Sequence, residues 1–252
     1  MLVNVDRILD AGAATGDASR RLAKLYRRSR VVSLDCSANM LRQARRKRTR
    51  FSRVEELQAD ASALPLQQGS VDLVFANMLL PWLDDLDGFF ESVNRVLRKD
   101  GLFVFSTLGP DSLSEIRGAW ASVDRGEHVN TFVDMHDIGD ALVRSGLREP
   151  VLDVDYLTVT YRTVDDLFAD LTRSGSRNSL KHRQRALTGK GRFGVLRRTL
   201  ANNCDGGVLP LQLELIFGHA WGGGPRPTPG EFRLDVSRIG RRSHPTQAHR
   251  MP

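Results

Sequence analysis

Residues 8–16 read Ile8-Leu9-Asp10-Ala11-Gly12-Ala13-Ala14-Thr15-Gly16, a short apolar strand that runs into a glycine turn and opens a helix. Glycine in such a turn lets a ligand approach the backbone closely at the carboxyl end of the strand. A dinucleotide-binding loop has this form, but Asp10 would repel a pyrophosphate at the helix N-terminus. The stretch therefore favours a ligand that carries a cationic amino group and no phosphate.

Polar residues follow at the ends of the next three expected strands. Asp35, with Cys36 beside it, ends the second strand and can accept hydrogen bonds from ribose hydroxyls. Asp60, followed by Ala61, can accept from an adenine amino group, and Asn77 faces the same crevice. Each aspartate taken alone could instead cap a helix or a turn. Together with Asp10, Gly12 and Gly16, these residues predict a site for S-adenosylmethionine, which has an ammonium group, ribose and adenine.

Alternation of strands and helices predicts an α/β fold with a mostly parallel, Rossmann-like sheet. The strands are expected at 7–11, 30–35, 54–59, 71–76, 102–107, 151–161 and 209–219. The helices are expected at 17–27, 38–47, 86–98 and 111–122, with one more from residue 134.

The expected domain organisation has four parts. Residues 1–161 form the core, 162–207 a helical cap inserted before the last strand, 208–221 that last strand, and 222–252 a basic, flexible tail. A cap of this size would lie over an active site.

Composition narrows the class of protein. The chain has 252 residues, 40% of them hydrophobic and 27% charged, which is typical of a globular protein. The sequence contains no apolar run of 18 residues and no signal-peptide pattern, so neither a membrane span nor secretion is expected. Cys36 and Cys204 lie in no Cys/His cluster, which predicts no metal site and a reducing cytoplasm.

The net charge of +7 is unevenly distributed. Residues 20–53 hold thirteen Lys and Arg and a single acid, Asp35. Such a stretch can attract nucleic acid, an anionic membrane surface or an acidic protein, or it can simply decorate solvated helices.

Several segments resemble one known family. The first 107 residues resemble class I S-adenosylmethionine-dependent methyltransferases, which implies a seven-stranded sheet, and later segments resemble the BioC family of biotin synthesis. The resemblance implies methylation of the free carboxylate of a malonyl thioester on acyl carrier protein, which is acidic, or on coenzyme A. The resembling segments are FSTLGPDSL at 105–113, HVN at 128–130, DMHDIGD at 134–140, LTVTY at 157–161, LTG at 187–189 and GHAW at 218–221.

The sequence departs from the family pattern at two places. Family members carry a helical segment before the first strand, so a lid over the cofactor is expected to be missing from this sequence. Ala14 stands where the family has the middle glycine of its loop, which is tolerable at negative φ and obstructive at positive φ.

A malonyl carboxylate is already ionised, so it needs alignment and hydrogen-bond donors rather than a general base. On this argument His136 and Asn130 are the candidate catalytic residues, and His128, Tyr161 and His219 the candidate substrate-binding residues. His136 could equally be a helix-start residue, and His219 a satisfied core histidine.

Other functions remain as alternatives. A nucleic-acid methyltransferase is disfavoured because residues 77–80 lack the Asn/Asp-Pro-Pro-aromatic loop that holds a flipped base. A protein-modifying assembly factor, such as a respiratory-complex arginine hydroxylase, remains open. An acidic carrier protein is expected to dock on the basic residues of the cap, among them Arg173, Arg183, Arg185, Arg192 and Arg197.

Overall fold

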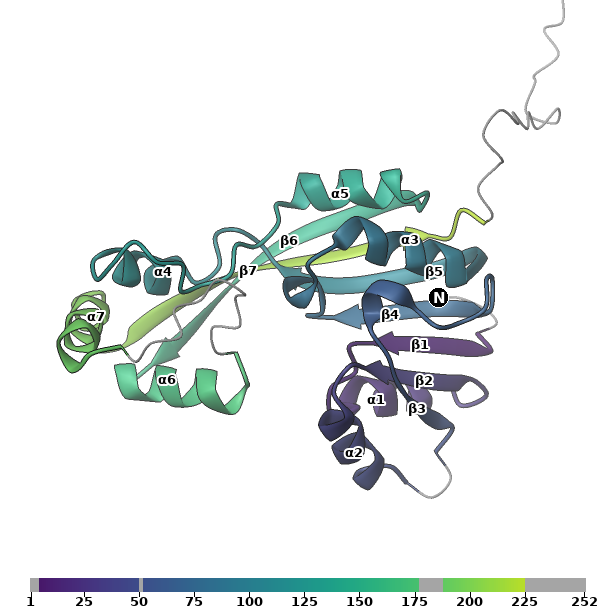
Figure 1. Ribbon diagram of the computed structural model, residues 1–252, viewed down its shortest axis with the longest axis horizontal. Coiled ribbons are helices and arrows are strands. Elements are labelled where there is room, and N and C mark those ends of the chain that lie inside the picture. Colours follow the sequence, from purple (N-terminus) through teal and green to yellow (C-terminus); the bar gives the residue numbers. More distant parts are fainter. Residues whose placement is uncertain (1–4, 50–51, 177–187, 225–252) are drawn as a thin grey trace, which may run out of the picture.

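A seven-stranded sheet forms the centre of the molecule in the computed structural model, which describes residues 5–49, 52–176 and 188–224 (Figure 1). Its strand order is β3-β2-β1-β4-β5-β7-β6, and β7 alone among these strands runs opposite to the other six. The predicted mostly parallel, Rossmann-like fold is therefore confirmed. The strands are β1 (Arg7–Ala11), β2 (Arg30–Asp35), β3 (Val54–Gln58), β4 (Val71–Asn77), β5 (Leu97–Leu108), β6 (Arg148–Tyr161) and β7 (Leu209–Trp221).

Helices cover both faces of the sheet around β1, which is apolar on both sides, whereas β5, β6 and β7 leave part of one face open. Successive residues of β1 show this: Leu9 packs in a core with α3 (Leu86–Val96) and α5 (Met135–Arg144), whereas Ile8 packs in a second cluster with α1 (Asp17–Leu25). The helix α2 (Ala38–Arg46) follows β2 and buries Leu41 and Ala44. Short 3₁₀ turns, η1 (Ala61–Ala63) and η2 (Leu80–Trp82), follow β3 and β4.

A helical lobe stands apart from β1, β2 and β3, on the side toward which β1 and β4 point (Figure 1). We define it as α4 (Ser114–Ala121), α6 (Val164–Arg173), α7 (Lys190–Asn202) and the adjoining ends of β6 and β7. The pairing of β5 with β7 begins at Leu215, so residues 209–214 of β7 extend beyond β5 and pair with β6. The lobe packs around its own core of Ile116, Ala119, Val164, Leu167, Leu196, Leu200, Leu209 and Leu211.

The four helices predicted with both ends are all shorter than expected: α1 ends at Leu25 rather than at 27, α2 ends at Arg46 rather than at 47, and α3 and α4 differ for tertiary reasons. The helix expected at 86–98 ends at Val96, because Leu97 is already extended and pairs with Val71 of β4. The helix expected at 111–122 begins at Ser114, because Leu113 adopts a left-handed backbone at φ 59°. Sheet pairing and one left-handed residue override the local helical pattern in these two places.

The β1–α1 turn requires left-handed backbone at three positions: Gly12 has φ 74°, Ala14 has φ 46° and Gly16 has φ 71°. A Cβ at Gly12 would lie 2.8 Å from Leu79 Cδ1, and one at Gly16 would lie 2.9 Å from Ala44 Cβ. The two glycines therefore permit close packing. Ala14 has a positive φ, which is the strained of the two conformations that the sequence left open.

Within the described residues, no helix is long and apolar enough to cross a membrane, and no three His, Cys, Asp or Glu side chains gather as metal ligands.

The strain at the turn has a measurable consequence. Ala14→Gly is expected to raise the free energy of unfolding by roughly 0.5 to 1 kcal/mol, because removing the Cβ relieves more strain than glycine costs in the unfolded chain. Gly16→Ala is the matched opposite change, and we expect it to lower stability by roughly 1 to 3 kcal/mol through backbone strain and the clash with Ala44. Urea unfolding measures both variants, and destabilisation by Ala14→Gly would contradict this account of the turn.

Candidate functional site

The predicted cofactor residues meet at the carboxyl edge of β1, β2, β3 and β4. Asp10 lies on β1, Asp35 and Asn77 are the last residues of β2 and β4, and Asp60 follows β3. The four strands are parallel neighbours, so their ends span about 14 Å at roughly 4.8 Å per strand. This edge can hold an elongated ligand in one continuous site.

Backbone hydrogen bonds fasten the glycine turn to β2. The amides of Gly12 and Ala13 both donate to the Leu34 carbonyl at 2.9 Å. The Ala14 amide donates to Asp35 Oδ2 at 2.8 Å, and the Ser37 amide donates to Asp35 Oδ1 at the same distance. Because a carboxylate can accept about four hydrogen bonds, Asp35 keeps acceptor capacity for ribose hydroxyls.

Asp10 is the buried acid of the site, with 1% of its surface exposed. Burial raises its pKa from 3.8 to about 6, the negative charge of Asp35 adds to the rise, and hydrogen bonds from Ser19 oppose it. The Ser19 hydroxyl donates to Asp10 Oδ2. A buried carboxylate of this kind is stabilised by a cation, so a ligand ammonium group would favour its ionised form.

The carboxyl edge is more exposed to solvent near β3 than at Asp10. Asp60 is exposed and its Oδ1 accepts the Ser62 amide at 2.9 Å, while Ala61 beside it is buried. Cys36 is exposed, and its carbonyl accepts a hydrogen bond from Gln58 at 3.2 Å. These residues leave a carboxylate and backbone groups facing solvent at the edge of β2 and β3.

Asn77 is positioned by the neighbouring strand. Ser106, its register partner on β5, donates a hydrogen bond from Oγ to Asn77 Oδ1 at 2.7 Å. The bond leaves the Asn77 amide nitrogen directed away from Ser106, and Asn77 itself is exposed. A hydrogen-bond donor is therefore held at the β4 end of the carboxyl edge, next to β5.

A cavity of about 270 Å³ adjoins the ends of β4 and β5. Its walls are mainly apolar and include Leu80, Pro81 and Phe132, and its polar lining residues are Thr107, Thr131 and the acid Asp84. Sequence reasoning did not identify this cavity. Thr107 directly follows Ser106 at a strand end, which was a usable signal, whereas Thr131 lies in a loop whose path no local pattern determines.

Two candidate substrate residues lie in the loop that leads from α4 to α5. Asn130 donates a hydrogen bond from Nδ2 to the Pro81 carbonyl at 3.2 Å, which brings it to η2 beside the cavity. The His128 ring stacks on Trp120 with ring centroids 3.6 Å apart, and its Nε2 lies 2.7 Å from Asp124 Oδ1. The loop therefore connects the helical lobe to the carboxyl edge.

The other three candidates lie elsewhere. His136 is exposed on the first turn of α5, with Nδ1 2.9 Å from Asp134 Oδ1. Tyr161 ends β6 in the helical lobe, and its hydroxyl donates to Asp170 at 2.9 Å. His219 pairs with Val104 and Val151, well back from the carboxyl end of β5.

His219 does not lie in the apolar core, which was the alternative that the sequence offered for it. It lines a groove on the open face of the sheet together with Phe217, which is 45% exposed, and Trp221. In the part of β7 from residue 214 to 220 the buried residues have the opposite parity, as Ile216 and Ala220 show. His219 is therefore neither a core residue nor close to the ends of β1 to β4.

Comparisons with known proteins identify the fold and the family. Residues 9–105 match the family described as a methyltransferase domain. The structure resembles the YcgJ protein from Bacillus subtilis with a TM-score of 0.60 at 16% identity, over 86% of this chain and 91% of that one.

Two curated relatives bear the same name, malonyl-acyl-carrier protein O-methyltransferase. The protein from Gallionella capsiferriformans is 41% identical over 87% of this chain and 78% of its own length. The protein from Methylovorus sp. is 43% identical over 85% of this chain and 74% of its own length. With this identity over most of both chains, the protein belongs to the malonyl-acyl-carrier protein O-methyltransferase family.

Proposed function

We propose that this chain transfers the methyl group of S-adenosylmethionine to the free carboxylate of a malonyl thioester carried by acyl carrier protein, a step of biotin synthesis. The observation that carries the proposal is the acid-lined carboxyl edge with its glycine turn, in a chain that belongs to this family. The names of the relatives favour this reaction over an arginine hydroxylase or another assembly factor.

The proposed cofactor site assigns one part of S-adenosylmethionine to each strand end. Gly12 and Gly16 let the methionine part approach the turn, and Asp10 balances its ammonium group. Asp35 accepts from the ribose hydroxyls, and Asp60 accepts from the adenine amino group between Cys36 and Ala61. Asn77 then lies nearest to the methyl group, next to the cavity at the end of β5.

The proposed chemistry needs position more than proton transfer. A carboxylate oxygen attacks the methyl carbon, the S–CH₃ bond breaks, and its electron pair returns to sulfur as the sulfonium charge is lost. Alignment of oxygen, carbon and sulfur and removal of water from the carboxylate lower the barrier.

The polar groups around the cavity suit this reaction. Thr107 and Thr131 offer neutral hydroxyl donors, the acid Asp84 also lines the cavity, and Asn130 holds the loop against Pro81. Neutral donors fit better than an arginine, which would stabilise the charged carboxylate more strongly than the transition state in which that charge is lost. We therefore assign Asn130 a positioning role and the cavity the malonyl group.

Coenzyme A remains an alternative carrier, since its thioester presents the same malonyl group. We propose a cytoplasmic enzyme, in keeping with two exposed free thiols at Cys36 and Cys204. We expect neither a membrane nor a nucleic acid as its substrate.

The first test is the reaction itself. Incubation with malonyl-loaded acyl carrier protein and S-adenosylmethionine is expected to add one methyl group to the acyl chain and to release S-adenosylhomocysteine, both measured by mass spectrometry. Acetyl-loaded carrier protein is the matched control, because it lacks the free carboxylate. Equal turnover with both substrates, or cofactor binding with no methyl transfer to the malonyl substrate, would refute the proposed reaction.

The ribose assignment predicts a loss of affinity. Asp35→Asn is expected to weaken S-adenosylmethionine binding by roughly 1 to 3 kcal/mol, because one acceptor of the carboxylate is lost. Asp17→Asn, at the exposed start of α1, is the control and should leave affinity unchanged. Titration calorimetry on both variants decides the point, and equal affinities would remove Asp35 from the ribose site.

The raised pKa of Asp10 predicts that fold stability and cofactor affinity both depend on pH. Its folded pKa is about 6 against 3.8 when unfolded, so Asp10 makes the fold less stable as the pH rises through this window. The ionised form binds an ammonium group better, so cofactor affinity is expected to rise between about pH 5 and pH 7 and then level off. Asp10→Asn should bind the cofactor weakly and without this rise. A flat profile for the unmodified protein would rule out contact between Asp10 and the ammonium group.

A further inference from the structure

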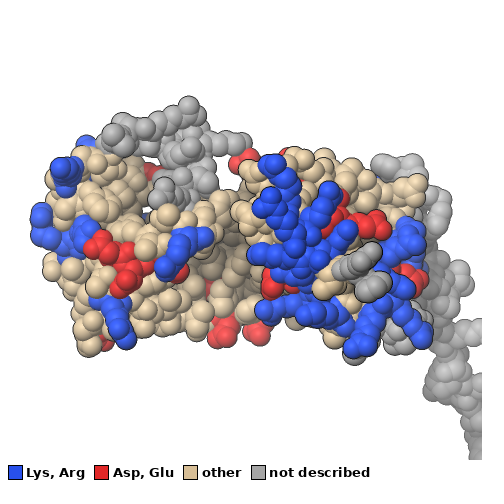
Figure 2. Space-filling view, turned by 90° about the horizontal axis from the view of Figure 1, so that it is seen from below, with Lys and Arg blue, Asp and Glu red and all other residues tan. Residues whose placement is uncertain are grey.

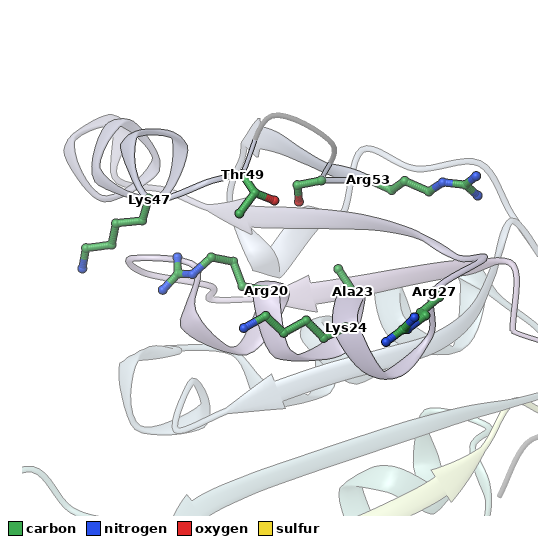
Figure 3. A pocket seen from close by; sticks show the side chains of 8 residues that line it. Arg20, Ala23, Lys24, Arg27, Lys47, Thr49 and Arg53 are labelled. Atoms are coloured by element: carbon green, nitrogen blue, oxygen red, sulfur yellow. The ribbon is translucent and has the colours of Figure 1, made fainter.

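A basic groove of about 470 Å³ lies between α1 and the connection from α2 to β3. The cationic side chains at its walls are those of Arg20, Lys24, Arg27, Lys47 and Arg53, as Figure 3 shows. None of them takes part in the hydrogen bonds of the carboxyl edge except Arg20. The proposed methyl transfer leaves this groove unexplained.

Most of the charge in the groove is not neutralised by the protein itself. In the part of the chain that the structure describes, no ion pair involves Lys24, Arg27 or Lys47. The nearby acids are already engaged: Asp17 pairs with Arg20 and Arg21, and Glu56 pairs with Arg45 and Arg48. Mutual repulsion of the remaining cations is a cost that an anionic partner would relieve.

The helical lobe, where the sequence predicts docking, has a different charge balance. Three of its arginines form ion pairs, at 3.5 Å between Arg173 and Asp170, 3.7 Å between Arg192 and Asp124, and 2.5 Å between Arg197 and Asp165. The other predicted contacts, Arg183 and Arg185, lie outside the described residues. Figure 2 shows Lys and Arg gathered over the α1 and α2 side of the molecule and interrupted by acids on the lobe.

The spacing of the cations indicates the shape of the partner. Arg20 and Lys24, at i and i+4, lie on one face of α1, and Arg27 follows in the turn after the helix, which ends at Leu25. Lys47 and Arg53 form the second wall. A single phosphate group would neutralise only one end of this row of cations, whereas an acidic helix laid along the groove would reach both ends.

The groove also reaches the proposed cofactor site. Arg20 donates a hydrogen bond from Nη1 to the Thr15 carbonyl at 2.9 Å, so the groove begins at the glycine turn. A partner seated along α1 would therefore hold a flexible thioester arm beside the carboxyl edge.

We propose that this groove is the docking surface for an acidic helix of the acyl carrier protein, an inference that rests on the proposed function. The electrostatic attraction acts mainly on the rate of association and on its salt dependence, because the cationic side chains stay solvated at the rim.

The test reverses three groove charges that lie away from the glycine turn. Lys24→Glu, Arg27→Glu and Lys47→Glu are combined, and association of fluorescently labelled malonyl-loaded carrier protein is followed by stopped flow. We expect the rate to fall tenfold or more at about 20 mM salt and to approach that of the unmodified protein at about 1 M, where the screening length is near 3 Å. Unchanged cofactor affinity confirms that the triple variant is folded.

The matched control places the same charge change on the helical lobe, as Arg162→Glu, Lys190→Glu and Arg198→Glu. The control should keep at least half of the original association rate, and equal slowing by both triple variants would overturn the proposal. Methylation of the malonyl thioester of N-acetylcysteamine, which has neither protein nor phosphate, should be the same in all three proteins.

Two further outcomes separate the hypotheses. Association that depends on the groove, without methylation of either substrate, would support docking and refute the proposed reaction. Unchanged carrier association with lost binding of a short DNA duplex would refute docking and assign the groove to nucleic acid.

Discussion

The site depends on the hydrogen bonds that fasten the β1–α1 turn to β2. Two amides share the Leu34 carbonyl and a third, that of Ala14, binds the Asp35 carboxylate. Without these bonds the buried amide of Ala13 would lack a partner, at a cost of about 1 to 3 kcal/mol. The same constraint forces left-handed backbone at Gly12, Ala14 and Gly16, and it fixes Asp35 where a ribose would lie.

The remaining architecture extends from this edge in two directions. On one side, α1 and the connection from α2 to β3 form the basic groove, which begins at the turn. On the other, the long β6–β7 hairpin carries a lobe with its own apolar core, joined to the edge by the loop containing His128 and Asn130. The molecule therefore combines a rigid cofactor platform with a separately packed lobe, which is a suitable arrangement for admitting a substrate on a flexible arm.

The sequence was sufficient for the features that local pattern controls. Alternating apolar runs and helix periods located all seven strands, and the spacing of Asp10, Asp35, Asp60 and Asn77 placed them at one edge because parallel strands end together. The ends of α3 and α4 were missed, because pairing of Leu97 with Val71 and the left-handed Leu113 are tertiary effects. The alternative of a core histidine at His219 was wrong, because its parity alone does not show which sheet face is covered by helices.

Charge was the least predictable property. The sequence located the basic stretch at 20–53 but could not show that the nearby acids are engaged elsewhere, nor that the lobe pairs its own arginines. Ion pairing depends on side chains that meet only in the folded chain, such as Arg197 and Asp165, 32 residues apart. The unneutralised charge of the groove could therefore be recognised only in the folded structure, which shows where the nearby acids form ion pairs.

The central claim is that one carboxyl edge binds the methyl donor in a single orientation. A crystal structure with S-adenosylhomocysteine tests it most directly. The account predicts the ammonium group near Asp10, the ribose on Asp35, the adenine at Asp60, and the sulfur facing Asn77 and the adjoining cavity. A ligand bound in the reverse orientation, or in the groove on the open sheet face beside His219, would contradict it.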